Sequence, residues 1–260
     1  MLCGLVAAQG ALGAPQPTRV LFVGNSLTYF NSLPSMVAAE AANGRPPARL
    51  EVEMLAAPGA LIRQHLDAGQ LGKVLAAGKF DVVVLQEVGG FPVCSNDYPG
   101  CQDSPAALDA AAELVRRSGA RAILLATYLR RPGLQAYLSL ASKDVAQRLK
   151  VDWFDWGQAM VDVGSRDETI AMTGPDLHPK PPGSWLAAIG LSQLITGAPP
   201  AAAPPAQVCA PDWSHAKPSI SNTSLASRQS QPAVNCFDLA DSTYSTLQQA
   251  VAHSLHRSAP

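Results

Sequence analysis

Charge is scarce in this sequence, and basic residues do not cluster anywhere in it. Charged residues make up 15% of the 260 positions, and the formal net charge is −1. Nucleic-acid-binding proteins meet the phosphate backbone with a positively charged surface, so this composition argues against such a partner. Long apolar runs are also lacking, and none reaches the roughly 20 residues that a membrane-spanning helix requires. We therefore expect no nucleic-acid partner and no membrane span.

Patterns of metal ligands are missing as well. The sequence has no CxxC pair, and no nearby pair of histidines stands at the spacing of zinc ligands. We therefore expect no metal site and no cofactor. The sequence leaves the oligomeric state open.

Cysteines are few, and their arrangement is typical of an exported protein. The five are Cys3, Cys94, Cys101, Cys209 and Cys236. Residues 1–14 are apolar and end in small residues, like the apolar segment and cleavage site of a secretory signal, although a positively charged start is missing. An apolar terminus without such a role is the alternative. Removal of a signal would leave four cysteines in two sequence-local pairs, Cys94 with Cys101 and Cys209 with Cys236. Four cysteines allow three pairings, and we expect these two local ones. We expect disulfides and a secreted or periplasmic location.

Hydrophobic residues make up 47% of the chain, enough for a sizeable core. Short apolar runs alternate with longer amphipathic stretches, which is the pattern of repeated strand–helix units. Strands are expected at 19–23, 50–55, 81–85, 120–127 and 151–155. Helices are expected at 33–42, 61–76, 106–117, 134–149 and 184–196. This order predicts an α/β fold, a three-layer α/β/α sandwich with a five-stranded parallel sheet of the flavodoxin-like kind.

The domain organisation follows from a change in composition near residue 198. Residues 15–197 carry the strand–helix pattern, whereas 198–235 are rich in proline, serine and alanine and lack periodicity. Residues 241–255 resemble a closing amphipathic helix. We expect one core at 15–197, with 198–260 forming an excursion and a C-terminal helix that complete the same domain.

The strongest local motif is Gly24-Asn25-Ser26-Leu27, directly after the first expected strand. A serine on such a turn is exposed at the sheet edge, close to backbone N–H groups that stabilise an oxyanion. A turn that merely caps a helix is the alternative for these residues. Gly59 follows the second strand, and Gln86 ends the third, where a backbone N–H and a side-chain amide can donate further oxyanion hydrogen bonds.

An acid–base pair stands near the end of the core. Asp176 and His178 share one loop, and a helix opens a few residues later at Ser184. A catalytic histidine needs an acceptor that orients its ring, which a nearby aspartate supplies. A surface Asp–His pair in a turn is the alternative.

Together these residues resemble the SGNH (GDSL-like) hydrolase superfamily. The string VLFVGNSLTYFNSLP resembles the first sequence block of its GNS-type secreted bacterial branch, and Gly59 matches the glycine of the second block. VVVLQE matches the third block, with Gln86 in place of the usual asparagine, and HPKPPGSWLAA matches the last. The resemblance covers 19–196 and implies a serine hydrolase with Ser26 as nucleophile, His178 as base and Asp176 as its orienting acid. It also implies an oxyanion hole formed by Ser26, Gly59 and Gln86.

One departure leaves a second candidate base. The superfamily has two residues between the aspartate and the histidine, whereas Asp176 and His178 have one. Asp212 and His215 have the usual spacing, but they stand in the Pro/Ser-rich excursion and no Gly and helix follow them. We predict His178 as the base and keep His215 as the alternative.

The resemblance implies an exported serine esterase that removes short acyl or acetyl groups, with a small-molecule or carbohydrate ester as substrate. A lipase-like or thioesterase-like hydrolase is the alternative among enzymes. A non-catalytic carbohydrate-binding protein on the same fold is the alternative outside them.

Overall fold

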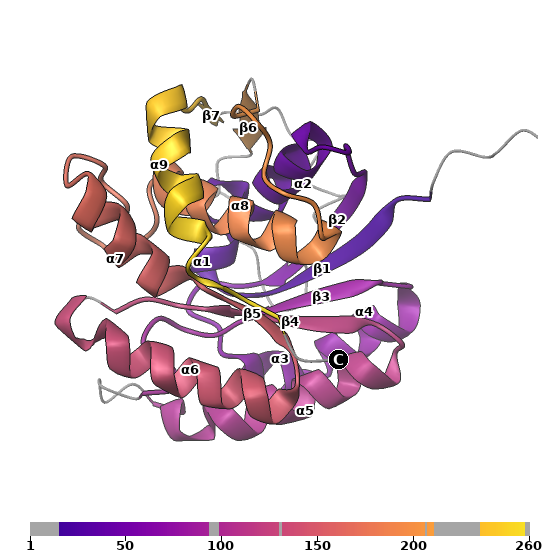
Figure 1. Cartoon of the computed structure of the whole chain (residues 1–260). Coiled ribbons are helices and arrows are strands. Elements are labelled where there is room, and N and C mark those ends of the chain that lie inside the picture. The colour runs from indigo at the N-terminus through magenta and orange to yellow at the C-terminus, as the bar shows by residue number, and fades with distance from the viewer. Residues whose placement is uncertain (1–15, 94–98, 130–131, 206, 211–234, 258–260) are drawn as a thin grey trace, which may run out of the picture.

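A six-stranded sheet forms the middle layer of the protein (Figure 1). The computed structural model describes residues 16–93, 99–129, 132–205, 207–210 and 235–257. The strands run in the order β2-β1-β3-β4-β5-β8. Their bounds are β1 Thr18–Gly24, β2 Leu50–Ala56, β3 Val82–Gln86, β4 Arg121–Ala126, β5 Asp152–Asp155 and β8 Leu255–His256. The first five are parallel and run in the order 2-1-3-4-5, so the expected flavodoxin-like α/β fold is confirmed.

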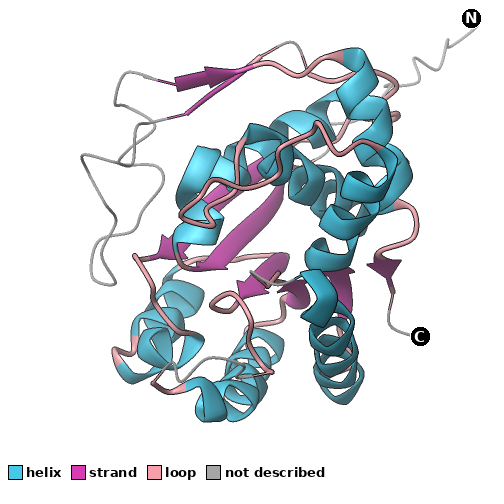
Figure 2. Cartoon of the chain, turned by 90° about the vertical axis from the view of Figure 1, so that its left-hand side faces the viewer, coloured by secondary structure: helices cyan, strands magenta, loops and turns pink. Residues whose placement is uncertain are grey.

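Helices cover both faces of this sheet. The described helices of eight or more residues are α2 Leu33–Asn43, α4 Gln70–Ala77, α5 Ser104–Arg117, α6 Gln135–Leu149, α7 Trp156–Arg166, α8 Pro181–Thr196 and α9 Asp241–Val251. The shorter ones are α1 Ser26–Tyr29 and α3 Ile62–Asp67. In the side view of Figure 2 the strands lie between the two groups of helices, and the short pair β6 Val208–Ala210 and β7 Asn235–Phe237 lies apart from the sheet.

The sheet differs from the prediction in having six strands rather than five. The sixth, β8, is antiparallel and pairs with β5 through Trp153 and His256, whose rings stack at 4.3 Å. The expected closing helix therefore ends at Val251, and the chain turns back to cover the sheet edge. Covering an edge strand protects its unpaired backbone groups from other chains.

The expected helix 61–76 is two helices, because the chain turns at Gly69, which has a φ of 64°. Such a conformation favours glycine, which has no Cβ to clash with the carbonyl. Two helices were not expected from the sequence, namely the four-residue α1 and α7. Helix α7 starts directly at the end of β5, with Asp155 accepting a hydrogen bond from the Gln158 N–H at its N-terminus.

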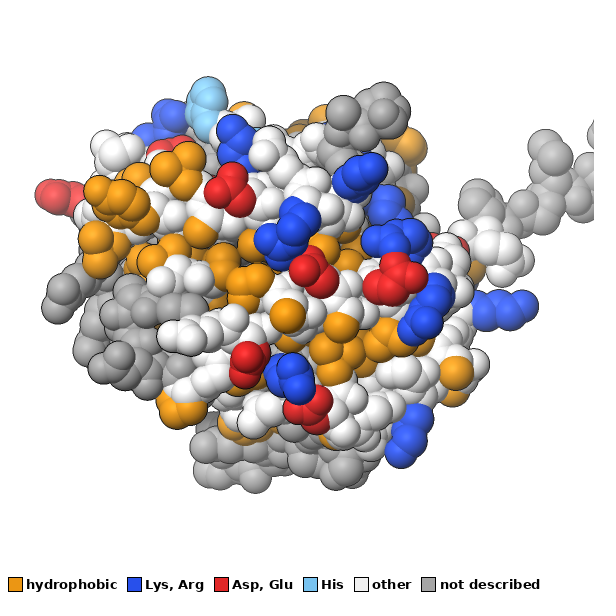
Figure 3. Space-filling view, turned by 90° about the horizontal axis from the view of Figure 1, so that it is seen from below, with side chains coloured by type: hydrophobic (Ala, Val, Ile, Leu, Met, Phe, Trp, Pro, Cys, Tyr) orange, Lys and Arg blue, Asp and Glu red, His pale blue; other side chains and the backbone are white. Residues whose placement is uncertain are grey.

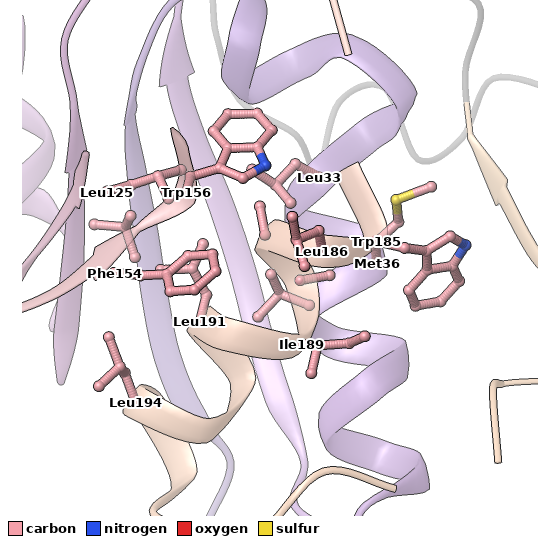
Figure 4. Packing of buried hydrophobic residues seen from close by; sticks show 14 of the residues in the cluster. Leu33, Met36, Leu125, Phe154, Trp156, Trp185, Leu186, Ile189, Leu191 and Leu194 are labelled. Carbon is pink, nitrogen blue, oxygen red and sulfur yellow. The ribbon is translucent and has the colours of Figure 1, made fainter. Parts of the chain in front are cut away.

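Alternate residues of each strand point to opposite faces, and each face has its own core. On one face, residues such as Phe22 and Phe154 pack against α2, α7, α8 and α9. Figure 4 shows this core, with Leu186 and Ile189 of α8 between the sheet and α2. On the other face, residues such as Leu21 and Leu85 pack against α3, α4, α5 and α6. Burial on both faces explains why the strands read as continuous apolar runs in the sequence.

The outer face of the α5–α6 layer, seen in Figure 3, carries acidic and basic side chains side by side. Ion pairs on its helices include Arg148–Asp109 at 3.0 Å and Arg63–Asp67 at 2.8 Å. All four side chains are about half exposed, so these pairs contribute little to stability. Within the described ranges, no helix is long and apolar enough to cross a bilayer, and no cluster of three metal-ligating side chains occurs.

A disulfide joins Cys209 to Cys236, which are neighbours among the cysteines in sequence, and links β6 to β7. Cys101 is also disulfide-bonded, and Cys94, its expected partner, lies outside the described residues. The expected signal segment 1–14 and the alternative pair Asp212 and His215 lie outside them too.

Candidate active site

Ser26 lies at the carboxyl edge of the sheet, where β1 ends and α1 begins. Asn25 precedes it in an extended conformation, and its side-chain oxygen caps α1 by accepting from the Leu27 N–H at 3.1 Å. Asn25 is buried, whereas Ser26 is partly exposed. The Asn25 side chain thus caps the helix beside a partly exposed serine.

Gln86 lies under this turn and is fully buried. Its side-chain oxygen accepts hydrogen bonds from the Asn25 N–H at 3.2 Å and from the Thr28 hydroxyl at 2.7 Å. Its amide nitrogen donates to the carbonyl of Glu87. The amide therefore ties the end of β3 to the serine turn, and one of its two N–H groups is engaged with the backbone.

Gly59 lies in the loop after β2, next to the serine turn. It has a φ of 61°, inside a turn closed by the Ala60 N–H donating to the Ala57 carbonyl at 3.1 Å. The Asn25 side-chain amide donates to the Ala60 carbonyl at 3.2 Å. This bond joins the first and second sequence motifs, so the structure brings Ser26 and the Gly59 loop to the same sheet edge.

Asp176 and His178 form a hydrogen-bonded pair in spite of their short spacing. The His178 Nδ1 lies 2.8 Å from one carboxylate oxygen, and the His178 backbone N–H donates to the other at 3.2 Å. Leu177, between them, has a φ of 66°, a left-handed conformation that is rare for leucine and that folds the chain back on itself. The hydrogen bond from His178 lowers the pKa of Asp176, so the carboxylate stays ionised.

The loop that carries His178 is fixed to the two residues that directly follow α1, the helix that begins at Ser26. The ring of Phe30 stacks on the His178 ring, with centroids 3.9 Å apart and planes 7° from parallel. The Asn31 side-chain amide donates to the Pro179 carbonyl at 2.8 Å and to the Ser184 hydroxyl at 2.9 Å. Phe30 caps α1 by donating its backbone N–H to the Ser26 carbonyl, so the residue that stacks on His178 follows Ser26 by about one helical turn.

A second support for this loop comes from β4. Tyr128 lies just after that strand. Its hydroxyl donates to the Leu177 carbonyl at 2.8 Å, and its ring packs edge-on against the Trp156 ring. The Trp156 indole N–H donates to the Gly183 carbonyl at 2.9 Å. Burial raises the pKa of Tyr128, and the negative charge of Asp176 adds to this shift, so the hydroxyl remains a donor.

The structure therefore places Ser26, Gly59, Gln86, Asp176 and His178 at one edge of the sheet. Within the described chain no hydrogen bond joins the Ser26 hydroxyl to the His178 ring, whose Nδ1 is held by Asp176. The Nε2 atom is then the ring nitrogen left for a proton transfer. In ligand-free sites such contacts are often long and shorten on substrate binding.

Three residues that support this site were not predicted from the sequence. Phe30 and Asn31 come three and four positions after the serine motif, so their place in the string TYFNSLP was the available signal. Glu87 follows Gln86 and is 4% exposed. Its carboxylate accepts from the Ile62 N–H at 3.3 Å and the Val88 N–H at 3.0 Å, and burial raises its pKa to about 7. It joins the end of β3 to the start of α3.

Comparison with known proteins supports the fold. The sequence matches no family model and no curated protein. A candidate SGNH hydrolase from Slackia heliotrinireducens has a similar structure, with a TM-score of 0.51 and 23% identity over 69% of this chain and 99% of that one. Axe2, an acetylxylan esterase from Geobacillus stearothermophilus, has a TM-score of 0.56 and 17% identity over 69% and 94%. At these identities the likeness establishes the fold, which is that of the SGNH hydrolases.

Proposed function

We propose that this protein is a serine esterase that hydrolyses short-chain acyl esters through an acyl-enzyme on Ser26. The observation that carries the proposal is the Asp176–His178 pair, held against the helix of Ser26 by the Phe30 ring and the Asn31 amide. A histidine whose Nδ1 is bound by a carboxylate has its Nε2 oriented for general-base catalysis. The fold shared with SGNH hydrolases supports the same assignment.

In the proposed mechanism the Ser26 hydroxyl oxygen attacks the ester carbonyl while the His178 Nε2 takes the hydroxyl proton. Asp176 holds the Nδ1–H and stabilises the imidazolium that forms. Collapse of the tetrahedral intermediate breaks the ester C–O bond, and His178 returns the proton to the leaving alcohol. Water then attacks the acyl-enzyme by the reverse sequence, which releases the acid and regenerates Ser26.

Three groups are proposed to stabilise the oxyanion. They are the backbone N–H groups of Ser26 and Gly59 and the Gln86 N–H that is not directed at the Glu87 carbonyl. Asn25 donates hydrogen bonds to the Gln86 side chain on β3 and to the Ala60 carbonyl in the Gly59 loop, and these bonds keep the three groups in place before substrate binds. Preorganised donors of this kind account for a large share of catalysis in acyl transfer.

For the substrate we propose an acetyl or other short acyl ester on a carbohydrate. Support comes from the sequence resemblance and from the similar fold of Axe2, which is an acetylxylan esterase. Lipase-like or thioesterase-like substrates are the alternatives. The Cys209–Cys236 disulfide supports a secreted or periplasmic location, because disulfides persist in oxidising compartments.

Substitution of the proposed triad tests the mechanism. Ser26→Ala and His178→Ala should each lower kcat on an aryl acetate about a thousandfold or more, because triad members act as a unit. Ser165→Ala, on the exposed end of α7, is the matched control and should leave kcat unchanged. His215→Ala should lower kcat at most a few-fold.

Labelling by a fluorophosphonate probe gives an independent readout. Wild type and Ser165→Ala should label, whereas Ser26→Ala should not. A folded wild type that neither labels nor hydrolyses any acylated sugar or aryl ester would favour the non-catalytic carbohydrate-binding alternative. Loss of activity in His215→Ala but not in His178→Ala would transfer the base to His215 and leave the serine hydrolase intact.

A further inference from the structure

A histidine that the proposed mechanism does not use lies directly behind the serine turn. His65, on α3, is fully buried, and its Nε2 lies 2.8 Å from the carbonyl oxygen of Gly24. Gly24 is the last residue of β1 and precedes Ser26 by two positions. The imidazole therefore contacts the backbone at the point where the strand ends and the catalytic turn begins.

The geometry fixes the state of this ring. A carbonyl oxygen only accepts hydrogen bonds, so the Nε2 of His65 carries the hydrogen and donates it. The Nδ1 is then an acceptor, and it has no partner among the described residues. Burial lowers the pKa of His65, which keeps the ring neutral at neutral pH.

Packing alone does not account for a histidine in this place. A buried acceptor without a partner costs stability, and an apolar side chain would avoid that cost. What the imidazole adds over an apolar side chain is the hydrogen bond to the Gly24 carbonyl. A histidine therefore differs from an apolar residue at this position by its hydrogen bond to the Gly24 carbonyl.

The Gly24 backbone is enclosed from the other side as well. A Cβ at Gly24 would lie 2.5 Å from both the Gln86 side-chain oxygen and the Thr28 hydroxyl. Gln86 comes from β3 and binds the next backbone N–H, that of Asn25. The turn is thus held by a strand on one side and by a helix, through His65, on the other.

We infer that His65 is a positioning residue that fixes the Gly24–Ser26 turn and thereby directs the Ser26 hydroxyl toward His178. This inference rests on the proposed function, since it concerns the reactivity of Ser26. Displacement of a nucleophile by about 1 Å lowers a rate by as much as a hundredfold. Loss of the His65 bond should therefore appear in the chemical step more than in substrate binding.

The test compares three variants with wild type. His65→Leu removes the donor, and His65→Gln keeps a side-chain N–H at a similar reach. Leu71→Ala is the control for stability, because Leu71 is fully buried on α4 in the same layer and belongs to neither the turn nor the site. For each protein we would measure the labelling rate with a fluorophosphonate per folded molecule, together with kcat and KM on an aryl acetate and the melting temperature.

We expect His65→Leu to lower the labelling rate and kcat at least about tenfold with KM nearly unchanged, and His65→Gln to recover most of this loss. Leu71→Ala should lower the melting temperature without changing either rate. If His65→Leu does not fold, His65→Asn replaces it, because its shorter amide does not reach the carbonyl.

Equal labelling rates and kcat in wild type and in a folded variant without the donor would overturn the inference and leave the proposed function standing. A loss of rate in Leu71→Ala as large as that in His65→Leu would also overturn it, since stability alone would then explain the effect. A wild type that does not react with the probe or hydrolyse esters would overturn the proposed function, and the inference with it.

Discussion

The contacts of Gln86 fit two roles, support of the serine turn and donation to an oxyanion. Substitutions at Gln86 and Thr28 distinguish these roles. Its oxygen accepts from the Asn25 N–H and the Thr28 hydroxyl, while its nitrogen directs one N–H at the Glu87 carbonyl and carries a second N–H that we propose as an oxyanion donor. We expect Gln86→Ala to lower kcat by about a hundredfold, roughly 3 kcal/mol, with KM little changed. Thr28→Val is the matched control, because it removes one bond to the same oxygen without touching the amide N–H. It should lower kcat only a few-fold, and an equal loss in both would assign Gln86 to the turn alone.

Glu87 should make stability depend on pH. Burial raises its pKa from 4.5 to about 7, so the folded state binds this proton more tightly than the unfolded state does. Its contribution is fully present below pH 4.5 and is lost as pH rises through about 7. The free energy of unfolding of wild type relative to Glu87→Gln should therefore fall by about 3 kcal/mol across this window.

Urea unfolding at a series of pH values measures this difference. Glu113→Gln is the control, since Glu113 is half exposed and pairs with Arg116 on the surface. A wild-type stability that runs parallel to that of Glu87→Gln from pH 4 to pH 8 would show that the carboxyl keeps its ordinary pKa in the folded protein.

At the scale of elements, one buried contact joins the C-terminal helix to the body of the protein. The Tyr244 hydroxyl of α9 donates to the Glu40 carboxylate of α2 at 2.5 Å, and the Ala201 N–H donates to the same oxygen at 3.3 Å. Both side chains are about 1% exposed, and burial raises the pKa of Glu40. Here α2, α9 and the segment after α8 meet in one hydrogen-bonded cluster.

Tyr244→Phe should lower the free energy of unfolding by about 1 to 3 kcal/mol, because it leaves a buried carboxyl oxygen without its main donor. Tyr137→Phe makes the same change on an exposed ring of α6 and should have almost no effect. Thermal unfolding of the two variants side by side checks this. A Tyr244→Phe protein as stable as Tyr137→Phe would mean that the hydroxyl contributes nothing to the docking of α9.

At the scale of the whole molecule, the Cys209–Cys236 disulfide closes a segment of 27 residues. In the chain-entropy model this closure stabilises the fold by roughly 3 to 4 kcal/mol, mainly by restricting the unfolded chain. The double variant Cys209→Ser, Cys236→Ser should therefore melt several degrees lower while hydrolysing esters at the wild-type rate, since neither cysteine belongs to the proposed site. Mass spectrometry after thiol blocking checks the pairing itself. Four free thiols in protein prepared under oxidising conditions would contradict both predicted disulfides and weaken the case for export.

Much of the fold followed from the sequence, because the signals for its strands and helices are local. Runs such as that of β3 combine β-branched residues without alternation, which is typical of strands covered on both faces. The serine motif directly follows a recognisable strand and the Asp–His motif shortly precedes a recognisable helix, so their residue types and their order along the chain could be predicted. The roles assigned to them remain predictions.

Other features depended on contacts between distant parts of the chain, which no local pattern encodes. The edge strand β8 forms because its two residues find β5 about a hundred positions away. The one-residue spacing of Asp176 and His178 gives a hydrogen-bonded pair because Leu177 takes a left-handed conformation, and Tyr128, just after β4, donates to its carbonyl. In the sequence His65 is an ordinary helix residue, and its contact with Gly24 is visible only in the folded structure. The sequence determined which chemical groups are present and on which elements, whereas packing between elements decided which of them meet.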